Sequence, residues 1–371
     1  MTMKKLIICI PSLRLGGAAK IALNLCEYFS ENDTKVTLLL TGGPEREQVF
    51  KDIPNGVDVI TFPKHHSSRV LNLFNKILWI ASYFKKIKPD AILAVRHDAT
   101  VPSSIAWRLS SRTGKFFIRE INPIRLTLHR NGIMVRMIQN AYSSATGIIA
   151  NSKDVLASLK EKKWVSENKL FSIDNPVLTK SFYGKVAEVV EDPWLNEPDI
   201  PLIITIGRLQ KMKAHDTLIK AFKIVRKKVN CRLMIIGEGE EHESLQKLID
   251  SLGLTSSVRL TGGMENPYPF LKAAEVFVLT SVYEGFGNVL VEALALGKKI
   301  VSTNCVGGPA YILNQGEYGA LVNVGGVEQI AQAILNKLSS LVDADKLVQR
   351  GKEFSVEVVG RKYSNVMFAK N

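Results

Sequence analysis

SVYEGFGNVLVEALALG, residues 281–297, has the pattern of a strand end, a glycine-rich turn and the first turns of a helix. Seven residues separate Glu284 in the expected loop from Glu292 on the second turn of the expected helix, which begins near Gly287. Gly285 and Gly287 let the backbone pass close to a ligand, and a helix N-terminus offers unpaired N–H groups. The pattern therefore predicts a phosphate site flanked by two carboxylates that accept hydrogen bonds from hydroxyl groups. A nucleotide sugar has this layout, with a hexose on one side of a diphosphate and a ribose on the other.

Short apolar runs alternate with helical patterns along the whole chain. The runs are residues 5–11, 35–40, 57–62, 91–95, 115–118 and 147–151 in the first half, and 201–207, 232–237, 257–262, 275–281 and 298–303 in the second. This alternation predicts two α/β domains, each built on a doubly wound parallel sheet. We expect an N-terminal domain of residues 1–183, an acidic, proline-containing linker at 184–200, a C-terminal domain of 201–351 and an amphipathic helix at 352–371.

Other candidate ligand-binding residues also follow predicted strands. Arg208 and Lys213, in GRLQKMK, come after the run 201–207. The planar guanidinium group of an arginine and the compact ammonium group of a lysine are together suited to bind a pyrophosphate. Basic loop residues are usually only solvated, so this prediction depends on the Glu284 loop in the same expected sheet. Gly16 and Gly17 follow the first strand, at an edge where parallel sheets bind ligands, although a bare turn needs no ligand.

The composition is that of a soluble globular protein, with 371 residues, 46% of them apolar and 23% charged. No apolar run approaches the roughly 18 residues of a membrane-spanning helix, so none is expected. The four cysteines and six histidines show no metal-ligand spacing. We therefore expect no metal site and no disulfide framework.

The positive charge is concentrated in the first half of the chain. Residues 1–180 contain 27 Lys and Arg against 14 Asp and Glu, whereas residues 181–371 contain 22 against 21. This asymmetry indicates an anionic membrane, a nucleic acid or a polyanionic substrate, or else a solubility charge without a partner. The segments 69–88 and 125–142 are amphipathic and basic, and such segments either lie in a bilayer interface or face their own core.

Five motifs together resemble the retaining glycosyltransferases of the family 4 type, which have the GT-B fold. They are GRLxxxK at 207–213, EGFGNVLVEA at 284–293, the GGA loop at 16–18, IIANS at 148–152 and DNPV at 174–177. The resemblance implies two Rossmann-like domains facing a cleft, with a C-terminal helix that crosses back to the first domain. Tyr311 departs from the family pattern, which usually has a carboxylate there, and this departure leaves the donor sugar open.

The resemblance also implies a donor site and the roles of its residues. Arg208 and Lys213 would bind the donor diphosphate. Glu284 would accept hydrogen bonds from the hydroxyl groups of the sugar, and Glu292 would accept them from the hydroxyl groups of the ribose. The implied donor site comprises Gly16, Gly17, Gly207, Arg208, Lys213, Glu284, Gly285, Phe286, Gly287, Asn288 and Glu292. Because two cations replace a metal ion in this family, neither a metal nor another cofactor is expected.

The acceptor is expected in the first domain. RHDATVPS at 96–103 resembles a family segment whose histidine lies near the donor sugar, which implies a catalytic or acceptor-binding role for His97. A histidine that merely caps a loop is the alternative. Glu120 matches an acidic position of related sequences and is expected to contact the acceptor, as is Lys20, which stands where the family often has Arg.

These observations lead to one main hypothesis and two alternatives. The chain is expected to transfer a hexose or N-acetylhexosamine, with retention, from a UDP-sugar to a lipid-linked saccharide. We expect it in the cytoplasm, peripheral on the inner face of the membrane. A sugar-nucleotide epimerase of the same fold and a non-catalytic membrane scaffold are the alternatives. Nucleic-acid binding is not expected, because the basic residues form no known nucleic-acid module.

Overall fold

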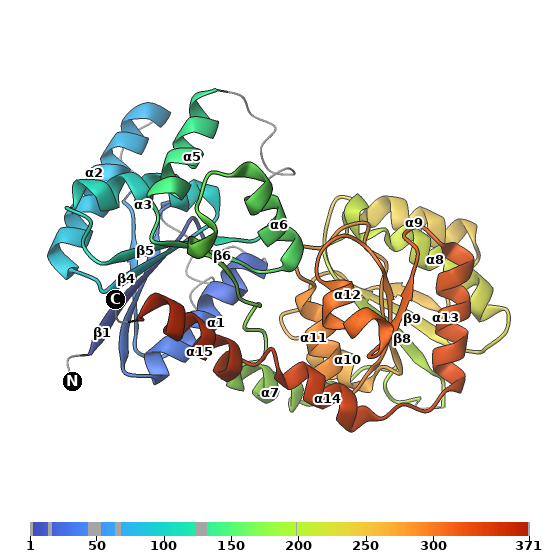
Figure 1. Cartoon of the computed structure of the whole chain (residues 1–371). Coiled ribbons are helices and arrows are strands. Elements are labelled where there is room, and N and C mark those ends of the chain that lie inside the picture. The colour runs from blue at the N-terminus through green and yellow to red at the C-terminus, as the bar shows by residue number, and fades with distance from the viewer. Residues whose placement is uncertain are drawn as a thin grey trace. The chain divides into compact units, whose positions relative to one another are not determined.

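The chain forms two compact units. The computed structural model describes residues 3–13, 17–43, 53–63, 68–122, 132–197 and 199–369. Met1–Val177 and Ser355–Asn371 form the first unit, and Leu178–Phe354 form the second (Figure 1). Each unit is built on one parallel sheet, which confirms the α/β architecture expected from the alternating apolar runs.

The first unit contains a seven-stranded sheet in the order β3-β2-β1-β4-β5-β6-β7. Its strands are β1 (Lys4–Ile10), β2 (Thr34–Leu40), β3 (Val57–Thr61), β4 (Ala91–Val95), β5 (Lys115–Glu120), β6 (Gly147–Ala150) and β7 (Leu170–Ser172). Its helices are α1 (Gly17–Glu31), α2 (Arg69–Ile87), α3 (His97–Leu109), α5 (Ile133–Ser144), α6 (Lys153–Lys162) and α15 (Val356–Met367), with a 3₁₀ turn, η2, at Glu167–Lys169. The strand order reverses between β1 and β4, where open sheets bind ligands at the carboxyl ends of the strands.

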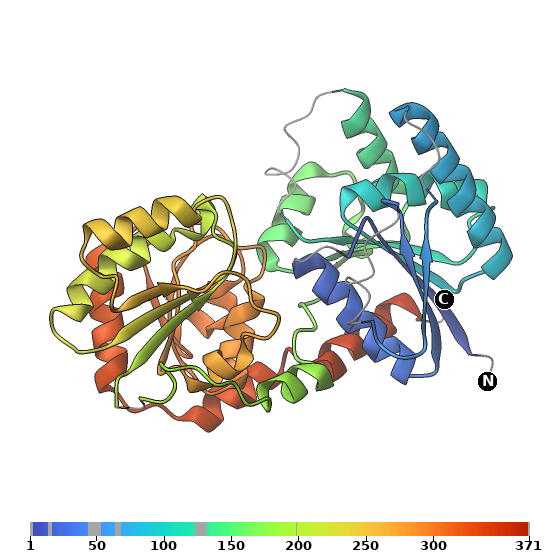
Figure 2. The ribbon, with the colours of Figure 1, turned by 180° about the vertical axis from the view of Figure 1, so that it is seen from behind.

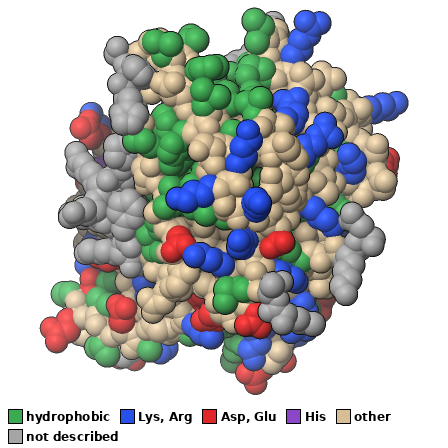
Figure 3. All heavy atoms as spheres, turned by 90° about the vertical axis from the view of Figure 1, so that its left-hand side faces the viewer, with side chains coloured by type: hydrophobic (Ala, Val, Ile, Leu, Met, Phe, Trp, Pro, Cys, Tyr) green, Lys and Arg blue, Asp and Glu red, His purple; other side chains and the backbone are tan. Residues whose placement is uncertain are grey.

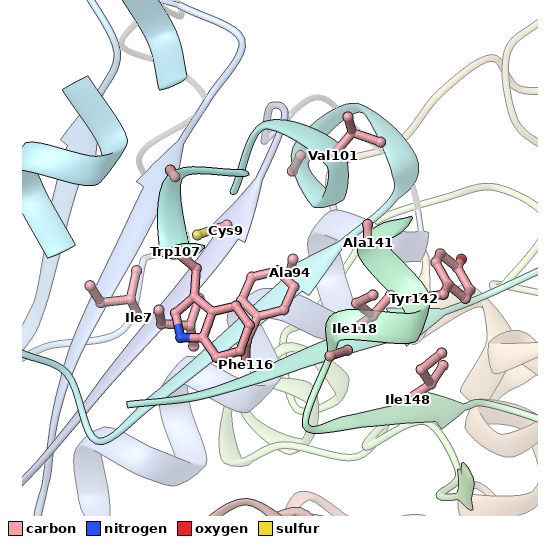
Figure 4. Close-up of a cluster of buried hydrophobic side chains, with 14 of the residues drawn as sticks. Ile7, Cys9, Ala94, Val101, Trp107, Phe116, Ile118, Ala141, Tyr142 and Ile148 are labelled. Atoms are coloured by element: carbon pink, nitrogen blue, oxygen red, sulfur yellow. The ribbon is translucent and has the colours of Figure 1, made fainter. Parts of the chain in front are cut away.

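Alternate residues of β5 face the two helical layers of the first unit. Phe116 and Ile118 point into the core beneath α3 and α5, where the Phe116 ring stacks on Trp107 at 5.3 Å (Figure 4). Arg119 points the other way, and its Nε donates to the Tyr363 hydroxyl of α15 at 2.9 Å. Because successive side chains of a strand point to opposite faces, Glu120 returns to the α3 and α5 side.

The second unit contains a six-stranded sheet in the order β10-β9-β8-β11-β12-β13. Its strands are β8 (Leu202–Ile206), β9 (Arg232–Ile236), β10 (Val258–Leu260), β11 (Val276–Leu279), β12 (Lys299–Thr303) and β13 (Ala320–Val322). Its helices are α7 (Lys180–Val186), α8 (His215–Arg226), α9 (His242–Ser251), α10 (Tyr268–Ala273), α11 (Asn288–Ala295), α12 (Pro309–Ile312), α13 (Val327–Ser339) and α14 (Ala344–Lys352), with 3₁₀ turns η3 (Lys211–Lys213) and η4 (Asn314–Gly316). In neither unit does a helix within the described ranges have the length and apolar character needed to cross a bilayer.

The segment predicted as a linker, 184–200, packs on the second unit. The guanidinium groups of Arg232 and Arg259 lie 5.3 Å and 4.4 Å from the centre of the Trp194 ring. Asp192 accepts a hydrogen bond from Arg259 at 2.8 Å. The chain therefore leaves the first unit before this segment, because cation–π and ion-pair contacts hold the segment against β9 and β10.

The C-terminal helix α15 packs on α1 in the first unit, as the resemblance implied. The two helices lie side by side in both ribbon views, α1 in blue and α15 in red (Figure 2). Gly360 of α15 faces the Tyr28 ring of α1 so closely that a Cβ atom at this position would lie 2.3 Å from the ring. Phe29 makes an edge-to-face contact with Phe368 at 5.9 Å.

We expect Gly360→Ala to destabilise the first unit. The added methyl group would force Tyr28 to move, and overpacking of this kind costs on the order of 1 to 3 kcal/mol. The midpoint of thermal unfolding should therefore fall.

Gly184→Ala is the matched control. Gly184 also lies in a helix, α7, but a Cβ atom there meets nothing within 4 Å. Alanine favours helix by about 1 kcal/mol over glycine, so this variant should be neutral or more stable. Equal midpoints for the two variants would show that the contact between Gly360 and Tyr28 is not tight.

Candidate functional site

Two loops of the second unit meet at the carboxyl edge of its sheet. The strands β8 and β11 pair in parallel, with Ile203 opposite Val276 and Ile204 opposite Phe277. The loop after β8 contains Arg208 and Lys213, and the loop after β11 contains Glu284. Parallel pairing therefore brings residues that are far apart in the sequence to one edge.

Lys213 and Glu284 form an ion pair across the two loops. Lys213 Nζ donates to Glu284 Oε1 at 2.5 Å, and the two side chains are only 16% and 10% exposed. Ser281 Oγ donates to the same carboxylate oxygen at 2.6 Å. The carboxylate of Glu284 is thus held on one side by a cation and a hydroxyl.

Hydroxyl and backbone hydrogen bonds fix the two loops to each other. Thr280 Oγ1 donates to the Lys213 carbonyl at 2.9 Å, and the Val282 N–H donates to the Met212 carbonyl at 2.8 Å. Thr303, at the end of β12, donates to the Ser281 carbonyl at 2.6 Å. No sequence motif marked these hydroxyl groups, although Thr280 and Ser281 directly precede the Glu284 loop.

The glycines of the Glu284 loop allow close backbone contacts. Gly287 has a φ of +96° and precedes α11, whose first residue is Asn288. A Cβ atom on Gly308 would lie 1.7 Å from the Phe286 carbonyl oxygen. Phe286 is buried, and its ring packs edge-to-face on Phe354 with the ring centres 5.8 Å apart.

Arg208 and Glu292 lie near this edge in different surroundings. Arg208 is exposed in the loop after β8, which begins at Gly207. The carbonyl of Arg208 bonds to His215 Nε2 at 3.3 Å, and burial lowers the pKa of His215 to about 4, so this imidazole is neutral at physiological pH. Glu292 is buried on α11, and its carboxylate accepts from the Tyr268 hydroxyl at 3.4 Å.

A second polar cluster lies in the first unit, where His97, Glu120 and Tyr142 come together. His97 Nε2 lies 2.9 Å from Glu120 Oε2 and 3.0 Å from the Tyr142 hydroxyl. The Tyr142 hydroxyl donates to the same Glu120 oxygen. Burial would lower the pKa of His97, but its hydrogen bond to Glu120 and the charge of that carboxylate raise the pKa above its ordinary value. Tyr142 was not predicted, because no motif lies beside it along the chain.

Two further predicted residues, Gly17 and Lys20, lie in the first turn of α1. Gly17 is its first residue, and Lys20 lies in its first turn, partly exposed. Gly16 lies outside the described residues.

Both halves of the chain match families of known proteins. Residues 15–180 match the family described as "Glycosyltransferase Family 4", and residues 188–354 match "Glycosyl transferases group 1". Together the two matches cover most of both units.

Curated relatives match over nearly the whole chain. The lipopolysaccharide core biosynthesis glycosyltransferase LpsE of Rhizobium meliloti is 26% identical and covers 96% of each chain. A Campylobacter jejuni enzyme is 29% identical over 93% of this chain and 92% of its own. Its name is N-acetylgalactosamine-N,N'-diacetylbacillosaminyl-diphospho-undecaprenol 4-alpha-N-acetylgalactosaminyltransferase.

Solved structures share the fold at low sequence identity. The lipopolysaccharide outer core galactosyltransferase WaaB, in its apo form, has a TM-score of 0.75 at 18% identity and covers 100% of both chains. HepE of Anabaena, in complex with UDP, has a TM-score of 0.79 at 18% identity and covers 99% of this chain and 100% of its own. These neighbours support the GT-B architecture.

We expect the Lys213–Glu284 pair to be strongly coupled in unfolding experiments. Removing one partner of a buried pair costs on the order of 3 kcal/mol, because the other charge stays buried alone. Lys213→Met and Glu284→Gln should each lower the free energy of unfolding, and the double variant should lose much less than the sum.

Lys220→Met and Asp216→Asn provide the matched cycle. This pair also joins a lysine to a carboxylate, at 2.9 Å, but its side chains are 48% and 49% exposed. Exposed pairs couple by only about 0.2 to 1 kcal/mol. Equal coupling energies from urea unfolding of the two cycles would contradict the assignment of a buried pair.

Proposed function

This chain belongs to the family 4 type of glycosyltransferases with the GT-B fold, and from that premise we propose that it transfers a hexose or N-acetylhexosamine from a nucleotide-diphosphate sugar to a lipid-linked saccharide. The observation that carries the proposal is the Lys213–Glu284 pair beside the N-terminus of α11. A sugar diphosphate places an anion next to a hydroxylated ring. The lysine can form an ion pair with the diphosphate, and the carboxylate can accept hydrogen bonds from the hydroxyl groups of the sugar.

The donor site follows from this arrangement. Lys213 and the exposed Arg208 would bind the diphosphate, helped by the backbone N–H groups at the start of α11. Glu284 would accept hydrogen bonds from the sugar, and Glu292 from the ribose of a donor that we propose to be a UDP-sugar. Binding exchanges the contact between Lys213 and Glu284 for two contacts with the ligand.

We propose that transfer proceeds with retention and without a metal ion. The bond between the anomeric carbon and the diphosphate oxygen breaks, and the acceptor oxygen forms its bond on the same face of that carbon. The acceptor proton moves to the departing diphosphate. Arg208 and Lys213 offset the charge that grows on the diphosphate, which is the task that a divalent cation performs elsewhere.

A lipid-linked acceptor is supported by the names of the relatives. The Campylobacter relative is named for transfer of N-acetylgalactosamine to a diphospho-undecaprenol-linked saccharide, and the Rhizobium relative for lipopolysaccharide core biosynthesis. Both names describe glycan assembly on lipid. The strong basic bias of residues 1–180 is consistent with such an acceptor.

The first experiment offers UDP- and GDP-sugars together with membrane extract, in the presence of a chelator. Transfer from a UDP-sugar to a lipid-extractable product supports the donor, the acceptor and metal independence together. NMR of the product linkage tests retention. Interconversion of nucleotide sugars without an acceptor would indicate an epimerase, and no turnover of any donor would indicate a scaffold.

Arg208→Met should lower kcat/KM for transfer about 100- to 1,000-fold, because one electrostatic donor to a developing charge is worth roughly 3 to 4 kcal/mol. Its side chain is exposed, so the fold should not suffer. Lys211→Met is the control, since Lys211 is an exposed cation of the same loop at a variable position of the GRLxxxK motif. Equal losses for the two variants would indicate a general charge effect and would contradict a specific diphosphate contact.

We further propose that the first unit binds the membrane through the apolar face of α2 and α5. This face consists of the exposed side chains Val70, Leu71, Phe74 and Leu78 of α2 and Ile133 and Met134 of α5. On α2 the spacing of the four residues places them on one side of the helix. Lys85 and Lys86 are also exposed, near the C-terminal end of α2.

The charge around this apolar face favours an anionic bilayer as its partner. Neither α2 nor α5 contains an Asp or Glu, and the exposed Arg136 adds to the lysines of α2. Hydrophobic side chains gather at one end of the face seen in Figure 3, with Lys and Arg side chains beside them. Each basic residue near an anionic surface contributes about 1 kcal/mol, and exposed Leu and Phe add their burial in the interface.

Leu71→Ser with Phe74→Ser should weaken binding to vesicles that contain anionic phospholipid about tenfold or more, since each side chain contributes on the order of 1 kcal/mol. The control replaces Val189 and Leu341, which are 93% and 100% exposed in the second unit, by serine. Sedimentation with vesicles measures both variants. Wild-type affinity in the α2 variant would contradict this surface, whatever the donor assays show.

A further inference from the structure

Glu120 lies in the interior of the first unit with its carboxylate fully engaged. Its Oε2 accepts from His97 and from the Tyr142 hydroxyl, and its Oε1 accepts from the N–H groups of Ile121 and Asn122 at 3.0 Å and 3.2 Å. The side chain is 5% exposed. A carboxylate with four donors and almost no surface has little capacity left for a substrate.

His97, in contrast, keeps part of its ring accessible. It is the first residue of α3, directly after β4, and its side chain is 21% exposed. Its Nε2 points to Glu120 and Tyr142, which leaves Nδ1 as the ring nitrogen that can meet a ligand. When the ring is protonated, Nε2 donates inward to the carboxylate and Nδ1 offers an N–H outward.

We infer that Glu120 and Tyr142 are positioning residues that hold His97 as an imidazolium, so that Nδ1–H is presented as a cationic hydrogen-bond donor to a substrate oxygen. Glu120 supplies the negative charge that makes the protonated ring favourable. Tyr142 donates to that carboxylate and fixes its orientation. That the oxygen belongs to a sugar substrate rests on the function proposed above, whereas the state of the ring does not.

The groups around His97 agree with this assignment. Burial raises the pKa of Tyr142 well above its ordinary value, as does the charge of Glu120, so Tyr142 stays a hydroxyl donor. Burial would raise the pKa of Glu120, but the bonds from His97 and Tyr142 lower it, so the carboxylate stays ionised. Of the nearer charges, Asp98 favours the protonated ring and Arg96 opposes it. Lys76 of α2 lies near enough to interact with Asp98.

The test is an NMR titration of the His97 ring in the whole protein without any sugar, with the signal assigned by its loss in His97→Gln. Wild-type His97 should titrate above the ordinary 6.5. In Glu120→Gln it should titrate below 6.5, because burial remains while the carboxylate charge is gone. Wild-type titration below 6.5 would overturn the inference without any variant.

Asp98→Asn is the matched control, because it removes the same charge from the residue next to His97. Asp98 is 72% exposed, so its removal should leave His97 titrating above 6.5. Equal shifts in the Glu120 and Asp98 variants would also overturn the inference. Tyr142→Phe should leave the ring charged but broaden or move its signal, since the carboxylate loses a fixed donor.

A kinetic experiment then links the ring to catalysis. Glu120→Gln should lose transfer at neutral pH as His97→Gln does, and lowering the pH should restore transfer in Glu120→Gln alone. Failure of every variant and of the wild type to transfer would concern the proposed function, whereas the NMR titration would still decide the state of His97. Transfer by wild type with no rescue of Glu120→Gln at lower pH would contradict the positioning role.

Discussion

The contact between Lys213 and Glu284 organises the ligand edge of the second unit. These residues lie 71 positions apart in the chain, and they meet because β8 and β11 are neighbours in a parallel sheet. A buried ion pair contributes little net stability compared with apolar packing, but it strongly specifies geometry, because each charge is costly without the other. The hydroxyl groups of Thr280, Ser281 and Thr303 add a second layer of specification. The pair and its supports thus keep a cation and a carboxylate at a fixed spacing.

The short apolar runs of the sequence were sufficient to predict the architecture, and the motifs pointed to the charged residues that follow β8 and β11. The three-residue edge strands β7 and β13 were not predicted. The prolines and acidic residues of segment 184–200 predicted a linker. The cation–π contacts of Trp194 with Arg232 and Arg259, which hold this segment on the second unit, were not predicted. Contacts such as those of Ser281 and Tyr142 depend on which loops and helices become neighbours. Local sequence does not carry that information.

Two consecutive residues of β5 link the stability of the first unit to its chemistry. Arg119 reaches Tyr363 of the C-terminal helix on one face of the sheet, and Glu120 reaches His97 on the other. Because side chains alternate along a strand, these adjacent charges contact different helices, Arg119 the C-terminal helix and Glu120 the start of α3. A register shift of β5 by one residue would exchange them, so the parallel pairing of β5 with β4 and β6 determines where the histidine finds its carboxylate.

The first unit is discontinuous in sequence, because α15 follows the whole of the second unit. On the ribosome, the strands and helices of residues 1–177 emerge first, but the contacts of Tyr28 with Gly360 and of Phe29 with Phe368 form only after α15 has been made. Domains that emerge early usually fold early during synthesis. Here the unit that is made first is completed last, and the second unit has its full sequence before the first can close its core. The unit that begins first along the chain is therefore the one whose sequence is completed last.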